Sequence, residues 1–116
     1  MDLTWVFWMD LSVGALIVIL GIPLILEKVK PNSVYGFRTV KTMSDEKIWY
    51  PANKYSGKLM IITGMIMILA SAILLCTNFG KAMPNAKTIV PLVALAVMLI
   101  PIIFMIIASV LYLKKL

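Results

Sequence analysis

Residues 59–79 read LMIITGMIMILASAILLCTNF and carry no charged side chain. A helix needs about 20 apolar residues to cross the hydrocarbon core of a bilayer, and this stretch has that length. Two further apolar runs share the property: 3–26, which is interrupted only by Asp10, and 88–113, which has no charge. The sequence therefore predicts an all-α integral membrane protein with three transmembrane helices, at about 3–26, 58–79 and 88–113.

The composition of the chain agrees with a membrane solvent. Of its 116 residues, 62% are hydrophobic, and the mean hydropathy is +1.02, whereas soluble domains are nearer half apolar. A water-facing fold of this size cannot hide so much apolar surface, so lipid must cover part of it. We expect a single membrane domain over residues 1–116. The first run is expected to stay as a span, because its flank Met1–Thr4 lacks the basic residues of a signal peptide.

Basic residues predict the orientation of the chain. They concentrate in the loop at about 27–57 and its edge, and at the C-terminus, whereas the second loop has only Lys81 and Lys87. The positive-inside rule then places the first loop and the C-terminus in the cytoplasm and the N-terminus outside the plasma membrane. The basic residues on the cytoplasmic side are Lys28, Lys30, Arg38, Lys41, Lys47, Lys54, Lys58, Lys114 and Lys115.

The same charges favour lipid over nucleic acid as the partner. The net charge is +6, but the basic residues lie beside apolar spans and are mixed with Glu27, Asp45 and Glu46. Attraction to anionic lipid headgroups is the natural consequence of such a pattern. We expect no nucleic-acid partner.

Residues for the common catalytic and metal chemistries are scarce. The chain has one cysteine, Cys76, and no histidine, so the usual zinc, haem and Cys/His nucleophile arrangements lack ligands or a base. Neither a Gly-rich phosphate loop nor a serine elbow is present. Asp45 and Glu46 are adjacent acids, which are typical of the positive first turn of a helix. We expect no enzyme activity, no cofactor and no metal site.

A short helix is predicted in the second half of the loop. Thr42 and Asp45 have the spacing of a capping box, and Ser44 followed by Asp45 and Glu46 is an alternative helix start. We expect this helix to be interfacial, bent at Pro51 and continuous with the second span. Spacings of three and four residues put one set of side chains on a single face of it: Trp49, Ala52, Asn53, Ser56 and Gly57.

Small residues form a stripe on the second span. Gly57, Gly64 and Ser71 are each one heptad apart. Small residues let helices approach closely in lipid. The stripe is expected either to pack the three spans of one chain together or to form a homodimer.

Two charged residues have both a functional and a structural interpretation. Asp10 is the only ionisable group inside a span, and such groups often mark functional sites; alternatively, it marks the start of the span, with residues 1–9 along the membrane surface. Arg38 follows a flexible Gly36, and its guanidinium can pair with Asp45 or Glu46, or with a lipid phosphate or bound protein.

Two residues of the loop helix also have structural interpretations. Trp49 lies at the membrane boundary, where tryptophan is usually an interfacial anchor. Asn53 can hydrogen-bond the loop backbone.

The loop closely resembles that of the SdpI immunity protein family. The resemblance covers about residues 28–113, in order and spacing, and this chain is similar to a short member that lacks an extra N-terminal membrane block. It is carried by Lys30-Pro31-Asn32, then by Tyr35-Gly36-Phe37-Arg38-Thr39, and then by Thr42, Ser44, Trp49, Asn53 and Gly57.

The resemblance implies a bacterial-type membrane protein. The name-giving members protect a cell against its own secreted killing peptide and sequester a cognate repressor at the membrane. The expected partners are thus the lipid bilayer, a peptide toxin, a cytoplasmic regulator and a second copy of the chain. The candidate binding residues are Asp10, Asn32, Tyr35, Gly36, Phe37, Arg38, Thr39, Thr42, Asp45, Trp49 and Asn53.

Two other functions fit the same residues. A small oligomeric transporter or channel subunit would use Asp10 on a polar path. A membrane protein that binds lipid headgroups would place Arg38 on a phosphate.

Overall fold

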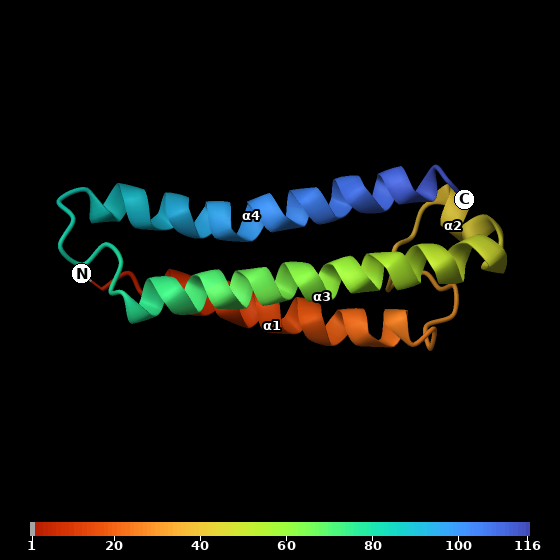
Figure 1. Ribbon diagram of the computed structural model, residues 1–116, viewed down its shortest axis with the longest axis horizontal. Coiled ribbons are helices and arrows are strands. Elements are labelled where there is room, and N and C mark those ends of the chain that lie inside the picture. Colours follow the sequence, from red (N-terminus) through yellow and green to blue (C-terminus); the bar gives the residue numbers. More distant parts are fainter. Residues whose placement is uncertain (1) are drawn as a thin grey trace.

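The computed structural model describes residues 2–116, and these residues form helices and turns without a strand. The elements are α1 (Trp5–Ile25), α2 (Val40–Ser44), α3 (Glu46–Cys76) and α4 (Ala86–Leu113). Helices α1, α3 and α4 are long and apolar enough to cross a membrane, which confirms the predicted fold class. Figure 1 shows them lying lengthwise in a narrow bundle of 54 × 22 × 20 Å. The N-terminus and the α3–α4 turn lie at one end, and the C-terminus and α2 at the other.

Helices α1 and α3 form an antiparallel pair with very close backbones. A Cβ placed on Gly14 would lie 2.8 Å from the carbonyl oxygen of Gly64, and a Cβ on Gly21 would lie 2.8 Å from that of Gly57. Real Cβ atoms do not approach so closely, so both crossing points depend on glycine. The predicted stripe of small residues therefore packs two spans of one chain together, which is one of its two expected uses.

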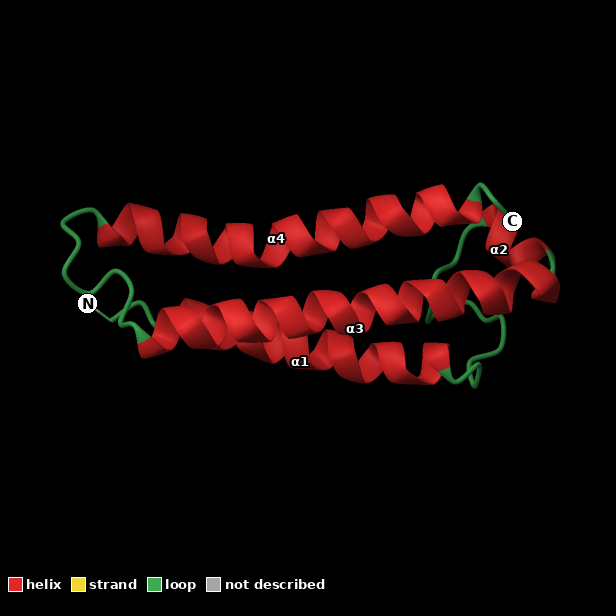
Figure 2. Ribbon diagram, in the orientation of Figure 1, coloured by secondary structure: helices red, strands yellow, loops and turns green. Residues whose placement is uncertain are grey.

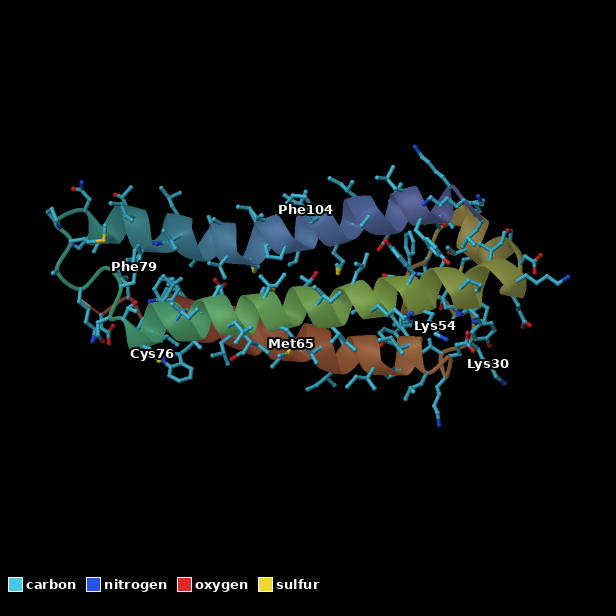
Figure 3. All side chains as sticks on the ribbon, viewed as in Figure 1. Lys30, Lys54, Met65, Cys76, Phe79 and Phe104 are labelled. Carbon is cyan, nitrogen blue, oxygen red and sulfur yellow. The ribbon has the colours of Figure 1, made fainter. Side chains whose placement is uncertain are left out.

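Helix α4 is the least buried of the three long helices. It buries Val90, Ala94, Ser109 and Leu113, and Phe104 points away from the other helices with 71% of its surface exposed (Figure 3). Near its start, Val90 and Ala94 pack against α1. Near its end, the Tyr112 ring stacks on Tyr55 with centroids 4.0 Å apart. Helix α4 is thus attached mainly near its ends.

The start of the loop helix differs from the prediction. The capping box is formed by Thr39 and Thr42, which begin the short helix α2, and the predicted box of Thr42 with Asp45 is wrong. Asp45 instead caps α3, where its side chain accepts the backbone N–H of Lys47. The N-cap of α3 therefore lies one residue after the alternative start at Ser44, which is the last residue of α2. Helix α3 then runs through Pro51 to Cys76 without a break, as expected.

Candidate functional site

The loop between α1 and α3 covers one end of the bundle and is the candidate site (Figure 2). We call residues 27–45, together with Trp49 and Asn53 of α3, the loop platform. Most of its residues lie outside helices. Such a segment has to satisfy its backbone groups by other means, and side chains of the platform do so.

Asn32 organises the first half of the loop platform. Its Oδ1 accepts the backbone N–H groups of Val34 at 2.9 Å and Tyr35 at 2.7 Å. Its Nδ2 donates to the carbonyl oxygens of Lys30 at 2.7 Å and Tyr35 at 3.0 Å. Asparagine is suited to this role because its short amide mimics a backbone turn. The Tyr35 hydroxyl then donates to the carbonyl of Leu20 and attaches the turn to α1.

Asn53 joins the second half of the loop platform to α3. Its Oδ1 accepts the backbone N–H of Phe37 at 2.6 Å, and its Nδ2 donates to the Phe37 carbonyl at 3.3 Å and to the Trp49 carbonyl at 3.0 Å. The amide is almost completely buried. The prediction that Asn53 bonds the loop backbone is confirmed.

Trp49 lies underneath the loop instead of anchoring in the membrane interface. Its side chain is 0% exposed, and its Nε1 donates to the carbonyl of Val29 at 2.8 Å. The anchor interpretation was therefore wrong. Trp49 is on the face of α3 that the loop covers, so the loop both buries the indole ring and accepts the hydrogen bond of its N–H. All five residues predicted on that face are buried: Trp49, Ala52, Asn53, Ser56 and Gly57.

Arg38 extends from the surface of the loop platform. Its Nε donates to the carbonyl oxygen of Asn32 at 2.8 Å, and the side chain is exposed. The expected internal partners were Asp45 and Glu46, but the hydrogen bond that the structure shows goes to the backbone. One edge of the guanidinium is thus fixed by the loop while the side chain remains accessible.

Exposed apolar side chains occur before and after Arg38 in the loop platform. Val34 is 85% exposed, Val40 is 93% exposed, and Met43 is also exposed. They were not predicted as site residues, because single apolar residues in a loop carry no chemical motif.

An apolar cavity of about 300 Å³ lies beneath the loop platform, between the helices. Tyr35, Gly36 and Phe37 contribute the loop side of its wall. The two serines in the wall, Ser56 and Ser109, are buried. The helices contribute Leu20 and Leu24 from α1, Ser56 and Met60 from α3, and Met105, Ile106 and Ser109 from α4.

The structure brings most of the predicted site residues together but separates Asp10 from them. Asp10 lies in α1 toward the other end of the bundle, is 0% exposed, and has no hydrogen-bond partner for either carboxylate oxygen within residues 2–116. Helix α1 begins at Trp5. Asp10 is therefore inside the helix, and residues 5–9 before it are helical and continuous with the rest of α1.

No metal centre is formed by the described part of the chain. Residues 2–116 contain no group of three or more His, Cys, Asp or Glu side chains arranged to hold an ion. Asp45, the remaining predicted site residue, is exposed and is occupied as a helix cap.

The chain has three helices long enough to cross a membrane, and the basic loop between the first two is held by its own hydrogen bonds. These features define the class of a small multi-pass membrane protein. The family model described as the SdpI/YfhL protein family matches residues 28–111, so this chain belongs to that family. Membership supports a membrane protein of the immunity type. The match includes the loop platform, α3 and most of α4, and it leaves out α1.

Part of the chain is similar to a curated bacterial protein. The chain is 46% identical over 66 residues to "Uncharacterized protein YfhL" of Bacillus subtilis (strain 168). The alignment covers 56% of this chain and 59% of the relative, so the chain spans about three-fifths of that protein. No solved structure matches this chain.

Proposed function

We propose that this protein is an SdpI-like membrane immunity or signalling protein whose loop platform binds a protein partner in the cytoplasm. The observation that carries the proposal is that the family-matched loop is fixed by its own side chains while Arg38 remains accessible. A loop that is ordered before binding loses less conformational entropy when a partner docks. The motif residues Asn32, Asn53 and Trp49 thus act as the support for a binding surface.

The exposed surface indicates the chemistry of the partner. Arg38 offers guanidinium N–H donors that fit a carboxylate in a two-pronged contact. Val34 and Val40, which lie four residues before and two residues after it in the chain, offer exposed apolar area. The partner we propose is a cytoplasmic regulator that presents an acidic residue next to apolar ones.

We infer the membrane orientation from the distribution of charge. Of the basic residues, only Lys81 and Lys87 lie near the α3–α4 turn, and the others lie at the end of the loop platform and the C-terminus. The positive-inside rule supports a cytoplasmic loop platform and an external N-terminus in the plasma membrane. A peptide toxin would then meet the spans from outside, and its binding would change how the loop platform is exposed inside.

The immunity function is tested by survival. A bacterial strain that is sensitive to the killing peptide resisted by the name-giving members of the family would express this chain, and we expect a higher surviving fraction than with an empty vector. Arg38→Ala should lower survival, because it removes the accessible guanidinium. Lys30→Ala, at another exposed basic residue of the loop platform, is the matched control and should survive like the parent. Equal killing with and without the chain would reject the immunity function.

Binding of lipid headgroups is a second candidate function. Arg38, Lys30 and Lys54 lie at the loop end of the bundle, and Figure 3 shows the two lysines there. A phosphate fits the guanidinium as well as a carboxylate does. If Arg38→Ala lowers the amount of anionic phospholipid that copurifies with the protein and leaves survival unchanged, this second function is favoured over the first.

A further inference from the structure

Asp10 is the one buried ionisable side chain that the loop platform does not explain. Its side chain is 0% exposed, and both carboxylate oxygens lack a hydrogen-bond partner within residues 2–116. Unpaired carboxylates are strongly disfavoured in an apolar surrounding. A carboxyl group in this position is therefore either protonated or paired with a group from another molecule.

A half-open cavity of about 170 Å³ adjoins Asp10 between α1 and α4, and Met9 and Leu95 in its wall are exposed at the surface of the bundle. One water molecule needs only roughly 10–15 Å³ of such space, so the cavity accepts a larger group. Its wall is apolar apart from the carboxylate. The lining consists of Val6, Met9 and Asp10 from α1, and Pro91, Ala94, Leu95 and Met98 from α4.

A second unpartnered polar atom lies at the same level of the bundle. The hydroxyl of Ser71 on α3 is fully buried and has no hydrogen-bond partner within the described residues. Gly14 packs against Met67: a Cβ added at Gly14 would lie 3.0 Å from the Cβ of Met67. Asp10 is one helical turn before Gly14, and Ser71 is one turn after Met67, which places both at one level of the α1–α3 pair.

We propose that this cavity is a binding site for an alkylammonium group, with Asp10 as the anionic partner. An ammonium has three donors and can satisfy both carboxylate oxygens in charge-assisted hydrogen bonds. The carbon chain of such a ligand would pack on Met9, Leu95 and Met98, and flexible methionine side chains adapt to ligands of irregular shape.

The composition of the wall argues against other ligand classes. A hard metal cation takes six or more oxygen ligands, and the wall contributes one carboxylate from residues 2–116. An anion would be repelled by Asp10. The proposal does not rest on the proposed function, because its anionic residue, Asp10, lies outside the family-matched residues 28–111 and at the other end of α1 from the loop platform.

Two sources can supply an alkylammonium group to this site: a small amphiphilic amine, or the lysine side chain of a membrane-inserted peptide. Binding of the group itself is tested with n-hexylammonium, and n-hexanol serves as the uncharged probe of the same length. The sample is the protein in lipid nanodiscs with ¹³C-methyl-labelled methionine, and the methyl groups are observed by NMR. We expect saturable methyl shifts at Met9 and Met98, with little change at the exposed Met43 of the loop platform. Hexanol should bind about tenfold more weakly or worse, because it lacks the charge-assisted bonds.

Variants identify the carboxylate as the partner. Asp10→Asn should weaken hexylammonium binding about tenfold or more, while Asp10→Glu keeps the charge and should retain most of the binding. Asp2→Asn is the matched control, since it removes an exposed carboxylate near the same end of α1 and should leave binding unchanged. The proposal is overturned if hexanol binds as tightly as hexylammonium, or if Asp10→Asn, shown to be folded by an unchanged spectrum at the remaining methionines, binds like the parent.

A competition experiment separates the two sources. A hydrophobic helical peptide with one central lysine is added to nanodiscs that contain the protein and hexylammonium, and the same peptide with leucine at that position is the control. Displacement by the lysine peptide alone assigns the site to a peptide side chain. Displacement by neither peptide, with hexylammonium still bound through Asp10, assigns it to a small amine.

Discussion

Gly36 lies directly against the side-chain amide of Asn53: a Cβ at Gly36 would be 2.8 Å from Asn53 Oδ1 and 3.2 Å from the Trp49 ring. Gly36 also has a φ of +115°, a conformation that L side chains rarely adopt. The turn of the loop platform thus depends on glycine twice, once for its backbone conformation and once for space. Any side chain at this position displaces the amide that holds Phe37.

Gly36→Ala is expected to destabilise the loop platform by about 1–3 kcal/mol through backbone strain alone. Hydrogen exchange of the Phe37 N–H, which is bonded to Asn53, should become correspondingly faster in nanodiscs. The control is Ser33→Ala, an exposed position in the same turn. If exchange at Phe37 is as slow in Gly36→Ala as in the parent, glycine is not required there.

Asn53→Ala is expected to cost about 2–3 kcal/mol, because it removes the partners of buried backbone groups at Phe37 and Trp49. Chemical denaturation in detergent and proteolysis of the loop both measure the effect. Asn85→Ala is the matched control: Asn85 is exposed and makes no capping hydrogen bond with its side chain. Similar losses in the two variants would show that Asn53 does not hold the loop.

The comparison of sequence and structure shows which features local patterns decide. The three spans were predictable because their length and apolarity depend on composition alone. The buried face of α3 was predictable because helical spacing fixes which residues share a side. The stripe of small residues on α3 was recognised as a packing surface for the same reason. The glycines that face it, Gly14 and Gly21 of α1, became evident only from the packing of α1 against α3.

Features that depend on contacts between distant residues were missed. The capping box was predicted at Thr42 with Asp45, because overlapping pairs three residues apart satisfy the same pattern and only the path of the loop selects Thr39 with Thr42. Trp49 was interpreted as an interfacial anchor, because its hydrogen bond to Val29 joins residues that are 20 positions apart. The burial of Asp10 depends on how the other helices pack around α1, which sequence spacing does not specify.

Gly64→Val tests the closest crossing of α1 and α3. A side chain there meets the Gly14 carbonyl and the Val18 side chain, so the helices must separate. Overpacking of this kind costs about 1–3 kcal/mol. Thermal unfolding in detergent measures the loss. Ile66→Phe enlarges an exposed side chain two residues away on α3 and should change stability little. Equal midpoints for both variants would contradict the close crossing.

Tyr35 predicts a loss of loop stability at alkaline pH. Burial raises the pKa of the Tyr35 phenol above its ordinary value of 10.0, and the neutral hydroxyl donates to the Leu20 carbonyl. Because the folded loop favours the protonated form, the stability is fully present below pH 10.0. It is lost as the pH rises through the higher pKa of the folded state.

The fluorescence of Trp49 measures this alkaline transition, in a background that also carries Trp5→Phe and Trp8→Phe. We expect the signal to change above pH 10.0 in this background and to stay flat over the same range when Tyr35→Phe is added. Tyr35→Phe also removes one hydrogen bond, which costs about 1 kcal/mol at neutral pH. Tyr50→Phe, in α3, is the control for loss of a tyrosine hydroxyl outside the loop. A transition that persists in Tyr35→Phe would assign it to another group.

The orientation of the bundle can be measured with two single-cysteine variants at its opposite ends. Ser33 in the loop platform and Asn85 in the α3–α4 turn are both exposed, and Cys76→Ala removes the one native thiol. Because the basic residues concentrate at the end with Ser33, the positive-inside rule places that end in the cytoplasm. On intact cells, a membrane-impermeant maleimide should label the Asn85→Cys variant and should label Ser33→Cys only after permeabilisation. The opposite pattern would put the loop platform outside the cell and remove the basis for a cytoplasmic partner.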